Sequence, residues 1–235
     1  MKTIGLIGGM SWESTLSYYK LLNEGVKTKL GGLHSAKIVL YSVDFAPIAR
    51  FQSEGEWDKA AAVIQEAAHA LEKAGAEMIL LCTNTMHKIL PLITPHIKTP
   101  FLHIADATSK ELLAHSCKKV ILLGTKFTMQ ESFYKEILNH HGIEVITPSH
   151  EAIETINQII YQELCLGVIE QRSLDYFIHT IEALKIAHDD IDSVILGCTE
   201  IGLLINSQNY SKLPLFDTTT IHVKHAISLA THQIS

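Results

Sequence analysis

Two stretches of this sequence decide its architecture: MILLCTNTMHKIL, Met78–Leu90, and SVILGCTEIGLL, Ser193–Leu204. In each, an unbroken apolar run ends in small polar residues before another apolar pattern begins. Unbroken apolar runs of this length are typical of parallel strands buried on both faces of a sheet. The polar residues then lie at the carboxyl end of a strand, where open parallel sheets bind their ligands.

The same alternation of apolar runs and helical periods continues along the chain, which predicts an α/β fold with parallel sheets. The predicted strands are Thr3–Ile7, Lys37–Ser42, Glu77–Leu81, Phe101–His103, Val120–Leu123, Glu144–Thr147 and Ser193–Leu196. The predicted helices are Trp12–Lys29, Trp57–Ala74, Phe127–Asn139, Glu151–Leu166, Arg172–Ile186 and a last one near Thr219–Thr231.

The two halves of the chain follow one plan. TIGLIGGMSWES (Thr3–Ser14) and VILLGTKFTMQES (Val120–Ser132) each contain an apolar strand, a glycine, a polar turn and a helix start. Aligning Gly8 with Gly124 gives an offset of 116 residues (124 − 8), which indicates a duplicated βα unit. We therefore expect two pseudo-symmetric parallel-sheet lobes, with the active site in the cleft between them. Prolines near residues 95–100 and 214 mark the expected crossovers, so the predicted lobes are residues 1–98 with 215–235, and residues 99–214.

The alignment of the two opening stretches depends on their apolar runs. Ile79–Leu81 matches Val194–Leu196, which places Thr83 opposite Cys198, at an offset of 115 (198 − 83), and Cys82 opposite Gly197. Because side chains alternate along a strand, a shift of one residue changes which side chain faces the ligand. We therefore expect Cys82 to be a structural residue that points into packing.

Composition excludes several classes of protein. The chain has 235 residues, of which 47% are hydrophobic and 19% charged, and a net charge of −6. This mild negative charge predicts no nucleic-acid partner and no membrane-surface partner. No apolar run reaches the length of a membrane span, and the four scattered cysteines predict a reduced, cytoplasmic location.

No cofactor is expected either. The fourteen histidines show no HExxH or paired spacing, so we predict no metal site. GLIGGM lacks the glycine spacing of a dinucleotide-binding motif. The strand ends instead carry GGMSWES, CTNT, GTKFTM and GCTE, each at the start of a helix, where backbone N–H groups favour a carboxylate ligand.

Six motifs together give the chain a clear resemblance. They are IGLIGGMSWEST, CTNTMH, FLHIADAT, LLGT, GCTEIGLL and PLFDTT. Over essentially its full length the chain resembles the cofactor-independent aspartate/glutamate racemase family. That resemblance implies two lobes around one active site, a small-molecule amino acid substrate, no pyridoxal phosphate, and a homodimer. In the family, one cysteine from each lobe acts on each face of the substrate's α-carbon.

The chain departs from the family pattern at one position, where Thr83 stands in place of the first cysteine. A similar Thr/Cys pair occurs in a branch of the family that favours L-aspartate and L-glutamate. The resemblance therefore implies that Cys198 takes the α-proton of the L-enantiomer while Thr83 serves the opposite face. A thiolate is a suitable base, and we expect the helix start after Cys198 to lower its pKa.

The remaining candidates surround these two residues. Backbone N–H groups of the turns Thr83–Thr85 and Cys198–Glu200 are expected to hold the substrate carboxylate. The expected substrate-binding residues are Met10, Gln52, Thr83, Asn84, Thr85, Thr199 and Glu200. Gln52 is equally compatible with a surface loop, and Met10 with a simple helix entry. Asp44 and Asp106 are expected to cap helices or serve turns.

Two other functions fit the same residues. The first is an amino acid racemase of broad specificity, because one sequence does not identify the residues that select the side chain of the substrate. The second is an amino-acid-binding sensor that lost catalysis together with the first thiol. The retained Cys198 argues against the sensor, since a protein that only binds needs no thiol there.

Overall fold

The computed structural model describes residues 1–232, which form two compact units. Unit 1 contains Met1–Ile104 and the C-terminal segment that begins at His222, and unit 2 contains Ala105–Ile221. Each unit has its own sheet and its own hydrophobic core. The lobe boundaries predicted above, at 98/99 and 214/215, stay a prediction.

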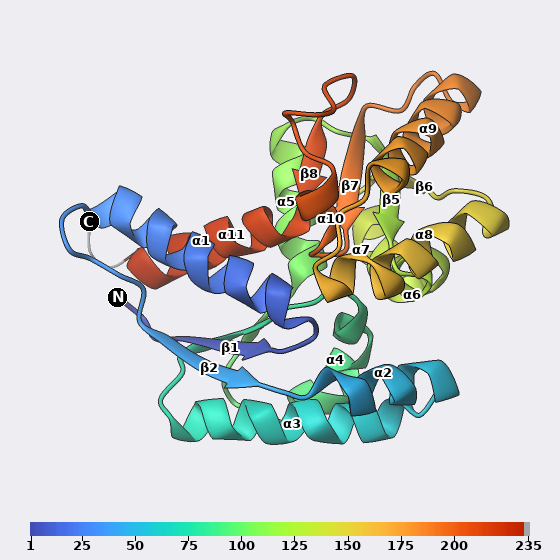
Figure 1. Ribbon diagram of the computed structural model, residues 1–235. Helices are drawn as coiled ribbons and strands as arrows, with labels where there is room; N and C mark the ends of the chain where they lie inside the picture. The colour runs from blue at the N-terminus through green and yellow to red at the C-terminus, as the bar shows by residue number, and fades with distance from the viewer. Residues whose placement is uncertain (233–235) are drawn as a thin grey trace. The chain divides into compact units, whose positions relative to one another are not determined.

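Unit 1 is built on four parallel strands in the order β2-β1-β3-β4. Helices α1 (Trp12–Leu30) and α11 (Thr218–Thr231, with its residues from His222 onward in this unit) pack on one face (Figure 1). Helix α3 (Trp57–Lys73) packs on the other face, where α2 (Phe45–Glu54) also lies. The strands are β1 (Ile4–Gly8), β2 (Ile38–Ser42), β3 (Met78–Leu81) and β4 (Phe101–Leu102).

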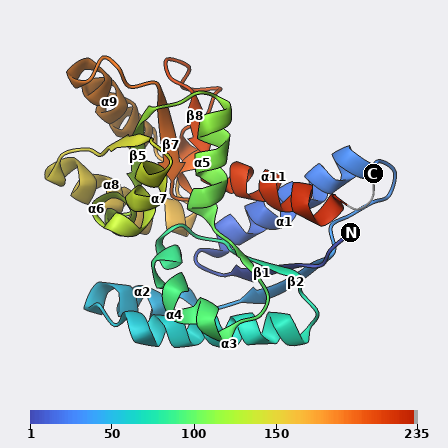
Figure 2. The ribbon, with the colours of Figure 1, turned by 180° about the vertical axis from the view of Figure 1, so that it is seen from behind.

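Unit 2 repeats this topology with the strand order β6-β5-β7-β8, all parallel. Helices α8 (His150–Gln162) and α9 (Gln171–Ala187) supply the core of one face. Helix α5 (Ile104–Ala114) lies along the other face in Figure 2, joined to α7 (Ser132–His140) by a hydrogen bond from the Tyr134 hydroxyl to Thr108. The strands are β5 (Lys119–Gly124), β6 (Glu144–Ile146), β7 (Ser193–Gly197) and β8 (Leu215–Asp217).

The strand registers confirm the alignment of the two halves. Ile7 pairs with Leu81 in unit 1, and Leu123 pairs with Leu196 in unit 2. Leu81 and Leu196 are therefore equivalent, so Cys82 corresponds to Gly197 and the next residues, Thr83 and Cys198, correspond to each other. The prediction of two parallel α/β units with a repeated topology is confirmed.

The structure differs from the predicted elements at several places. The helix expected at Phe127–Asn139 is broken into α6 (Lys126–Gln130) and α7 because Glu131 is extended, with φ −80° and ψ 162°. Helix α2 was not expected, and it accommodates Pro47 because a proline is tolerated in the first turn. The segment after Pro214 is strand β8 rather than only a crossover. Shorter elements complete the fold: η1 (Thr85–Ile89), α4 (Leu90–Ile93), η2 (Thr94–His96), η3 (Leu164–Leu166) and α10 (Ile201–Leu204).

Two glycines at strand ends permit a close approach of the backbone. Gly9 has φ +93°, and a Cβ there would lie 2.1 Å from the Val43 carbonyl oxygen. At the end of β7, a Cβ on Gly197 would lie 2.7 Å from the Leu123 carbonyl oxygen. The equivalent position in unit 1 holds the side chain of Cys82.

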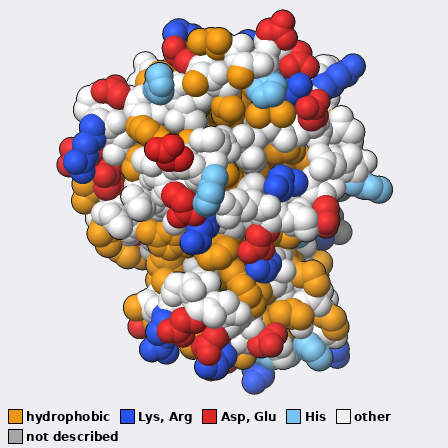
Figure 3. All heavy atoms as spheres, turned by 90° about the vertical axis from the view of Figure 1, so that its right-hand side faces the viewer, with side chains coloured by type: hydrophobic (Ala, Val, Ile, Leu, Met, Phe, Trp, Pro, Cys, Tyr) orange, Lys and Arg blue, Asp and Glu red, His pale blue; other side chains and the backbone are white. Residues whose placement is uncertain are grey.

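The surface carries charges of both signs. In Figure 3, Lys and Arg side chains alternate with Asp and Glu over the face shown, without a broad field of one sign. This pattern agrees with the mild net charge. None of the helices within residues 1–232 combines the length and apolar character needed to cross a membrane.

Cys82 is fully buried, as its position in the repeat predicts. Its thiol lies in the core between the sheet of unit 1 and helices α1 and α11, and burial raises its pKa. We expect Cys82→Ala to lower the free energy of unfolding by about 1–2 kcal/mol, because it leaves a small cavity. Urea denaturation checks this, with the half-exposed Cys165→Ala as a control of smaller cost. The racemase activity implied by the resemblance should persist; its loss in a well-folded Cys82→Ala chain would contradict the register.

His222 anchors α11 to the rest of unit 1. Its Nδ1 accepts a hydrogen bond of 2.8 Å from the Tyr18 hydroxyl of α1, and its Nε2 donates to the Leu102 carbonyl at 2.9 Å. The ring is completely buried, and this desolvation lowers its pKa to about 3. The buried ring is therefore neutral at physiological pH.

This burial predicts acid lability. The folded-state pKa of His222 lies below its unfolded value near 6.5. The contribution of the neutral ring to the free energy of unfolding is therefore complete above pH 6.5 and is lost as the pH falls toward about 3. Stability should decrease by about 1.4 kcal/mol per pH unit in this range. Urea denaturation at several pH values, compared with His222→Asn, checks this. The variant keeps an acceptor for Tyr18 but does not titrate, so identical pH slopes for both chains would contradict the prediction.

Candidate active site

The Thr83 turn (Thr83–Thr85) forms where strand β3 ends in unit 1. The Cys82 N–H donates to the Ile7 carbonyl at 2.9 Å, which extends the β1–β3 ladder by one residue. The Thr83 N–H then donates back to the Leu81 carbonyl at 2.8 Å, so the chain reverses tightly around Cys82. Thr83, Asn84 and Thr85 follow at once, almost completely buried although polar.

The structure corrects one expected contact in this turn. We expected the backbone N–H of Thr83 to hold a substrate carboxylate, but it is engaged by the Leu81 carbonyl. The reason is the tightness of the reversal, which uses this N–H within the turn itself.

Unit 1 brings Met10 and Gln52 to the same region. Gln52 lies on α2 rather than in a surface loop, is buried, and places its Nε2 3.0 Å from the sulfur of Met86, the residue after the Thr83 turn. Met10 is buried in the same core cluster as Met86. Ser14, in the first turn of α1, donates from its hydroxyl to the Cys82 carbonyl at 3.3 Å, which ties the start of α1 to the end of β3.

The two aspartates expected to cap helices are both near helix starts. Asp44 is the N-cap of α2, and its carboxylate accepts from the Ala46 N–H at 3.2 Å. Asp106 lies in the first turn of α5. The structure gives neither residue a contact with the turns described above.

The Cys198 turn (Cys198–Glu200) occupies the equivalent position in unit 2, after strand β7. The Cys198 thiol donates to Glu200 Oε2, with 2.9 Å between sulfur and oxygen. The Thr199 hydroxyl donates to the same oxygen at 2.8 Å. All three residues are buried, so one carboxylate oxygen organises the whole turn.

The pKa of Cys198 moves in the direction opposite to the expected one. Burial raises it well above the usual value, and the negative charge of Glu200 raises it further. The backbone of Glu200 lowers it only in part. The expected effect of a helix start is weak because α10 is only four residues long. In this state Cys198 is therefore a protonated thiol held by a carboxylate.

Two neighbours of Cys198 were missed in the sequence. Tyr161 and Cys165 are four residues apart at the end of α8 and in η3, and both pack against the core cluster that contains Cys198. Burial raises the pKa of Tyr161, and Cys198, Cys165 and Glu200 add to this effect. The spacing of four residues was the available signal. His87, which binds the Thr83 carbonyl, was likewise missed.

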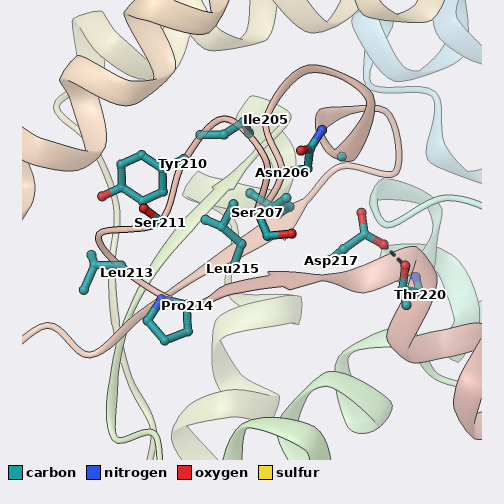
Figure 4. A pocket seen from close by; sticks show the side chains of 12 residues that line it. Ile205, Asn206, Ser207, Tyr210, Ser211, Leu213, Pro214, Leu215, Asp217 and Thr220 are labelled. Atoms are coloured by element: carbon teal, nitrogen blue, oxygen red, sulfur yellow. Dashed lines mark hydrogen bonds between the residues drawn. The ribbon is translucent and has the colours of Figure 1, made fainter.

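Unit 2 also contains a cavity of about 500 Å³ between α10, the loop after it and strand β8 (Figure 4). Its lining includes Tyr210, Leu213 and Asp217, but none of the expected site residues. Burial raises the pKa of Asp217, whose carboxylate accepts from the Thr220 N–H at 2.6 Å and caps α11. The part of the chain that the structure describes brings together no three His, Cys, Asp or Glu side chains that could hold a metal ion.

The chain is similar to several known proteins over nearly its whole length. Residues 7–226 match the family model described as Asp/Glu/Hydantoin racemase. A crystal structure of a provisionally assigned Asp/Glu racemase from Yersinia pestis is 50% identical, with a TM-score of 0.88, over 98% of this chain and 99% of that one. An aspartate racemase homologue from Pyrococcus horikoshii OT3 is 37% identical, with a TM-score of 0.84, over 98% and 100% of the two chains. The broad specificity amino-acid racemase RacX of Bacillus subtilis is 26% identical over 96% of each chain.

The matches to the family model and to the two solved structures extend over nearly the whole chain and include both turns. They confirm the resemblance drawn from the six motifs and the expectation of an enzyme of the isomerase class. The chain belongs to the Asp/Glu/Hydantoin racemase family.

Proposed function

We propose that this chain racemises an acidic amino acid, aspartate or glutamate, without a cofactor and with the L-enantiomer as the better substrate. Cys198 takes the α-proton of the L-enantiomer, and Thr83 serves the opposite face. The observation that carries the proposal is the hydrogen bond of 2.9 Å between the Cys198 thiol and Glu200. A buried thiol paired with a carboxylate is a nucleophile and base held next to a group that can accept its proton.

The chemistry begins with the thiol. Cys198 passes its proton to Glu200, which leaves a thiolate and a neutral carboxylic acid. The thiolate then removes the α-proton of the L-substrate and becomes a thiol again, while the substrate becomes a carbanion beside its own carboxylate. Because the thiol is protonated at rest, this first transfer is part of the energy barrier, and Glu200 keeps the transfer distance short.

The second half of the reaction uses the Thr83 turn. A proton from the Thr83 hydroxyl, directly or through a water molecule, reaches the opposite face of the carbanion and gives the D-enantiomer. Thr83 then recovers a proton from water, and Glu200 releases to water the proton that it took from Cys198, which restores the resting state. Asn84, Thr85 and Thr199 supply hydrogen-bond donors for the substrate carboxylates, and Gln52 and Met10 complete the binding residues of unit 1. A hydroxyl is a far weaker base than a thiolate at neutral pH, so the two faces are chemically unequal.

The preference for an acidic substrate is supported by the relatives. The Yersinia pestis and Pyrococcus horikoshii proteins, at 50% and 37% identity, are described as an Asp/Glu racemase and an aspartate racemase homologue. The Bacillus subtilis relative favours the alternative, because it is a broad-specificity racemase that aligns over 96% of this chain. The sensor remains the non-enzymatic alternative. Incubating the protein with a panel of amino acids in deuterium oxide separates the three.

Each alternative gives a distinct pattern of α-deuterium uptake. Uptake confined to aspartate and glutamate supports the proposal. Uptake by neutral or basic amino acids at a rate similar to that of aspartate and glutamate supports broad specificity. Binding without uptake by any amino acid supports the sensor.

The homodimer and the cytoplasmic location implied above are part of the same proposal. Trp12, Leu16 and Tyr19 are exposed at the helical spacing i, i+4, i+7 on one side of α1. A stripe of this kind can pair with its own copy about a twofold axis, and aromatic residues are enriched at such interfaces. We assign the dimer contact to this stripe.

Substitutions of Cys198 and Thr83 should affect the reactions of the L- and D-enantiomers differently. Cys198→Ala should abolish α-proton exchange from L-aspartate and L-glutamate, because no other strong base replaces the thiol. Thr83→Cys should instead raise kcat from the D-enantiomer, on the order of 10-fold or more, because a thiol replaces a hydroxyl. Initial rates from each pure enantiomer, with deuterium uptake at the α-carbon, measure both effects.

The equilibrium between enantiomers gives this experiment an internal check. It is fixed at equality, so kcat/KM must be the same in both directions and any inequality of kcat must be offset in KM. Equal kcat values for L and D in the natural chain, or an active Cys198→Ala chain, would contradict the assignment.

Removing the Glu200 charge should have two opposite effects. Glu200→Gln should lower the pKa of Cys198, because the carboxylate raises it, and should therefore shift the pH profile of Cys198 alkylation by iodoacetamide to lower pH. It should also slow α-proton exchange by roughly 100-fold, since the proton acceptor is gone. Faster exchange that follows the larger thiolate fraction would show that Glu200 only suppresses the thiolate. Cys198→Ala is the control, because any alkylation that remains in it comes from the other thiols.

A further inference from the structure

A buried histidine outside the proposed chemistry contacts the backbone of the Thr83 turn. His87 lies in η1, four residues after Thr83, with an exposed fraction of 1%. Its Nδ1 is 2.8 Å from the Thr83 carbonyl oxygen. The ring centroid lies 4.6 Å from that of the partly buried His103 and 6.0 Å from that of the buried His222, so three imidazoles lie together in unit 1.

The hydrogen-bond partners of His87 determine its tautomer. The Ile104 N–H donates to Nε2 at 3.2 Å, so this nitrogen carries no proton. The proton of the neutral ring is therefore on Nδ1, from which it donates to the Thr83 carbonyl. Burial, with smaller effects of His103 and His222, lowers the pKa of His87 well below its usual value and keeps the ring neutral.

The bond from His87 to the Thr83 carbonyl adds to the backbone hydrogen bonds that hold this turn. The Thr83 N–H is held by the Leu81 carbonyl, its carbonyl is held by His87, and the His87 N–H donates to the Asn84 carbonyl at 3.1 Å. Both peptide groups that flank Thr83 are thus fixed. The direction of the Thr83 and Asn84 side chains follows from this backbone, because side-chain direction is set by the backbone that carries it.

We propose that His87 is the positioning residue of the Thr83 turn, and that its Nδ1–H bond to the Thr83 carbonyl aims the Thr83 hydroxyl at the substrate. The inference rests on the proposed function for the role of Thr83, but not for the bond itself. His87 does not touch the substrate; it acts through the backbone of the residue that does. A misplacement of a reacting group by about 1 Å is enough to cost a large factor in rate.

The same cluster provides a matched control. Tyr18 donates to His222, and His222 donates to the Leu102 carbonyl, two residues before Ile104. These bonds stabilise the same core but none reaches the Thr83 turn. Tyr18→Phe removes a bond of this network that ends on His222 and not on the Thr83 turn, so it reports the effect of lost stability.

Two substitutions of His87 separate its two hydrogen bonds. In His87→Asn, the side-chain amide can occupy the position of Nδ1 and donate to the Thr83 carbonyl, while the acceptor for Ile104 is lost. In His87→Gln, the longer side chain can place its oxygen near the position of Nε2 and accept from Ile104, while the donor to Thr83 is lost. Each variant therefore keeps one bond and removes the other.

The experiment compares kcat, KM and thermal midpoint for the natural chain and the three variants. We expect His87→Gln to lower kcat on the order of 100-fold with a smaller change in KM. We expect His87→Asn to restore kcat to within about threefold of the natural chain although its thermal midpoint falls. Tyr18→Phe should lower the midpoint without this loss of kcat. Equal kcat in the Gln and Asn variants, or losses that follow the midpoint alone, would overturn the inference.

A second readout does not depend on activity. In the natural chain, nitrogen-15 NMR should report a His87 ring protonated on Nδ1, and the amides of Thr83 and Asn84 should exchange slowly with solvent. Faster exchange of these amides in His87→Gln, but not in His87→Asn or Tyr18→Phe, supports the inference even if no amino acid is turned over, an outcome that would overturn only the proposed function. Protonation on Nε2, or equal amide exchange in all four chains, would overturn the inference itself.

Discussion

A parallel strand covered by helices on both faces can carry polar groups only where it ends. Strands β1, β3 and β7 are buried along their whole length and β5 everywhere except at Lys119, so the polar side chains of the Thr83 turn and the Cys198 turn lie where β3 and β7 end. The turns are buried as well, which requires each polar group to have a partner. The short bonds at Thr83, His87, Cys198 and Glu200 follow from this requirement.

The two turns meet this requirement in different ways. In the Cys198 turn, side chains bond to one another, with Glu200 as the common acceptor for a thiol and a hydroxyl. In the Thr83 turn, the partner of the side chain is the backbone: the neutral imidazole of His87 donates a hydrogen bond to the Thr83 carbonyl. No charged group takes part in this bond. The charge of Glu200 changes the pKa of the Cys198 thiol. The neutral His87 fixes the backbone of the Thr83 turn and adds no charge there. This difference agrees with the roles proposed for Cys198 as a base and for Thr83 as a weak proton donor.

Much of this arrangement was accessible from the sequence. The apolar runs placed seven of the eight strands found within residues 1–232. The match of Ile79–Leu81 with Val194–Leu196 predicted the equivalence of Thr83 and Cys198 that the strand registers confirm. Strand β8 was missed because its three residues come directly after Pro214, which was taken to mark a crossover between the lobes. The predicted direction of the pKa shift of Cys198 was wrong. The shift depends on burial and on where the Glu200 side chain points, and the local motif determines neither. His87 was missed because its partner is a backbone carbonyl, which leaves no trace in residue types.

The unequal strand ends also bear on how the two halves can evolve. Position 82 holds a cysteine side chain in the core of unit 1, while Gly197 has a Leu123 carbonyl oxygen 2.7 Å from where a Cβ would be. Copying CTNT from the first repeat over GCTE in the second would force a side chain into that space. Recombination between the repeats is therefore penalised at this position, and the two halves of the ancestral duplication have ceased to be exchangeable. Such a barrier would let the Thr83 turn and the Cys198 turn diverge without being made alike again.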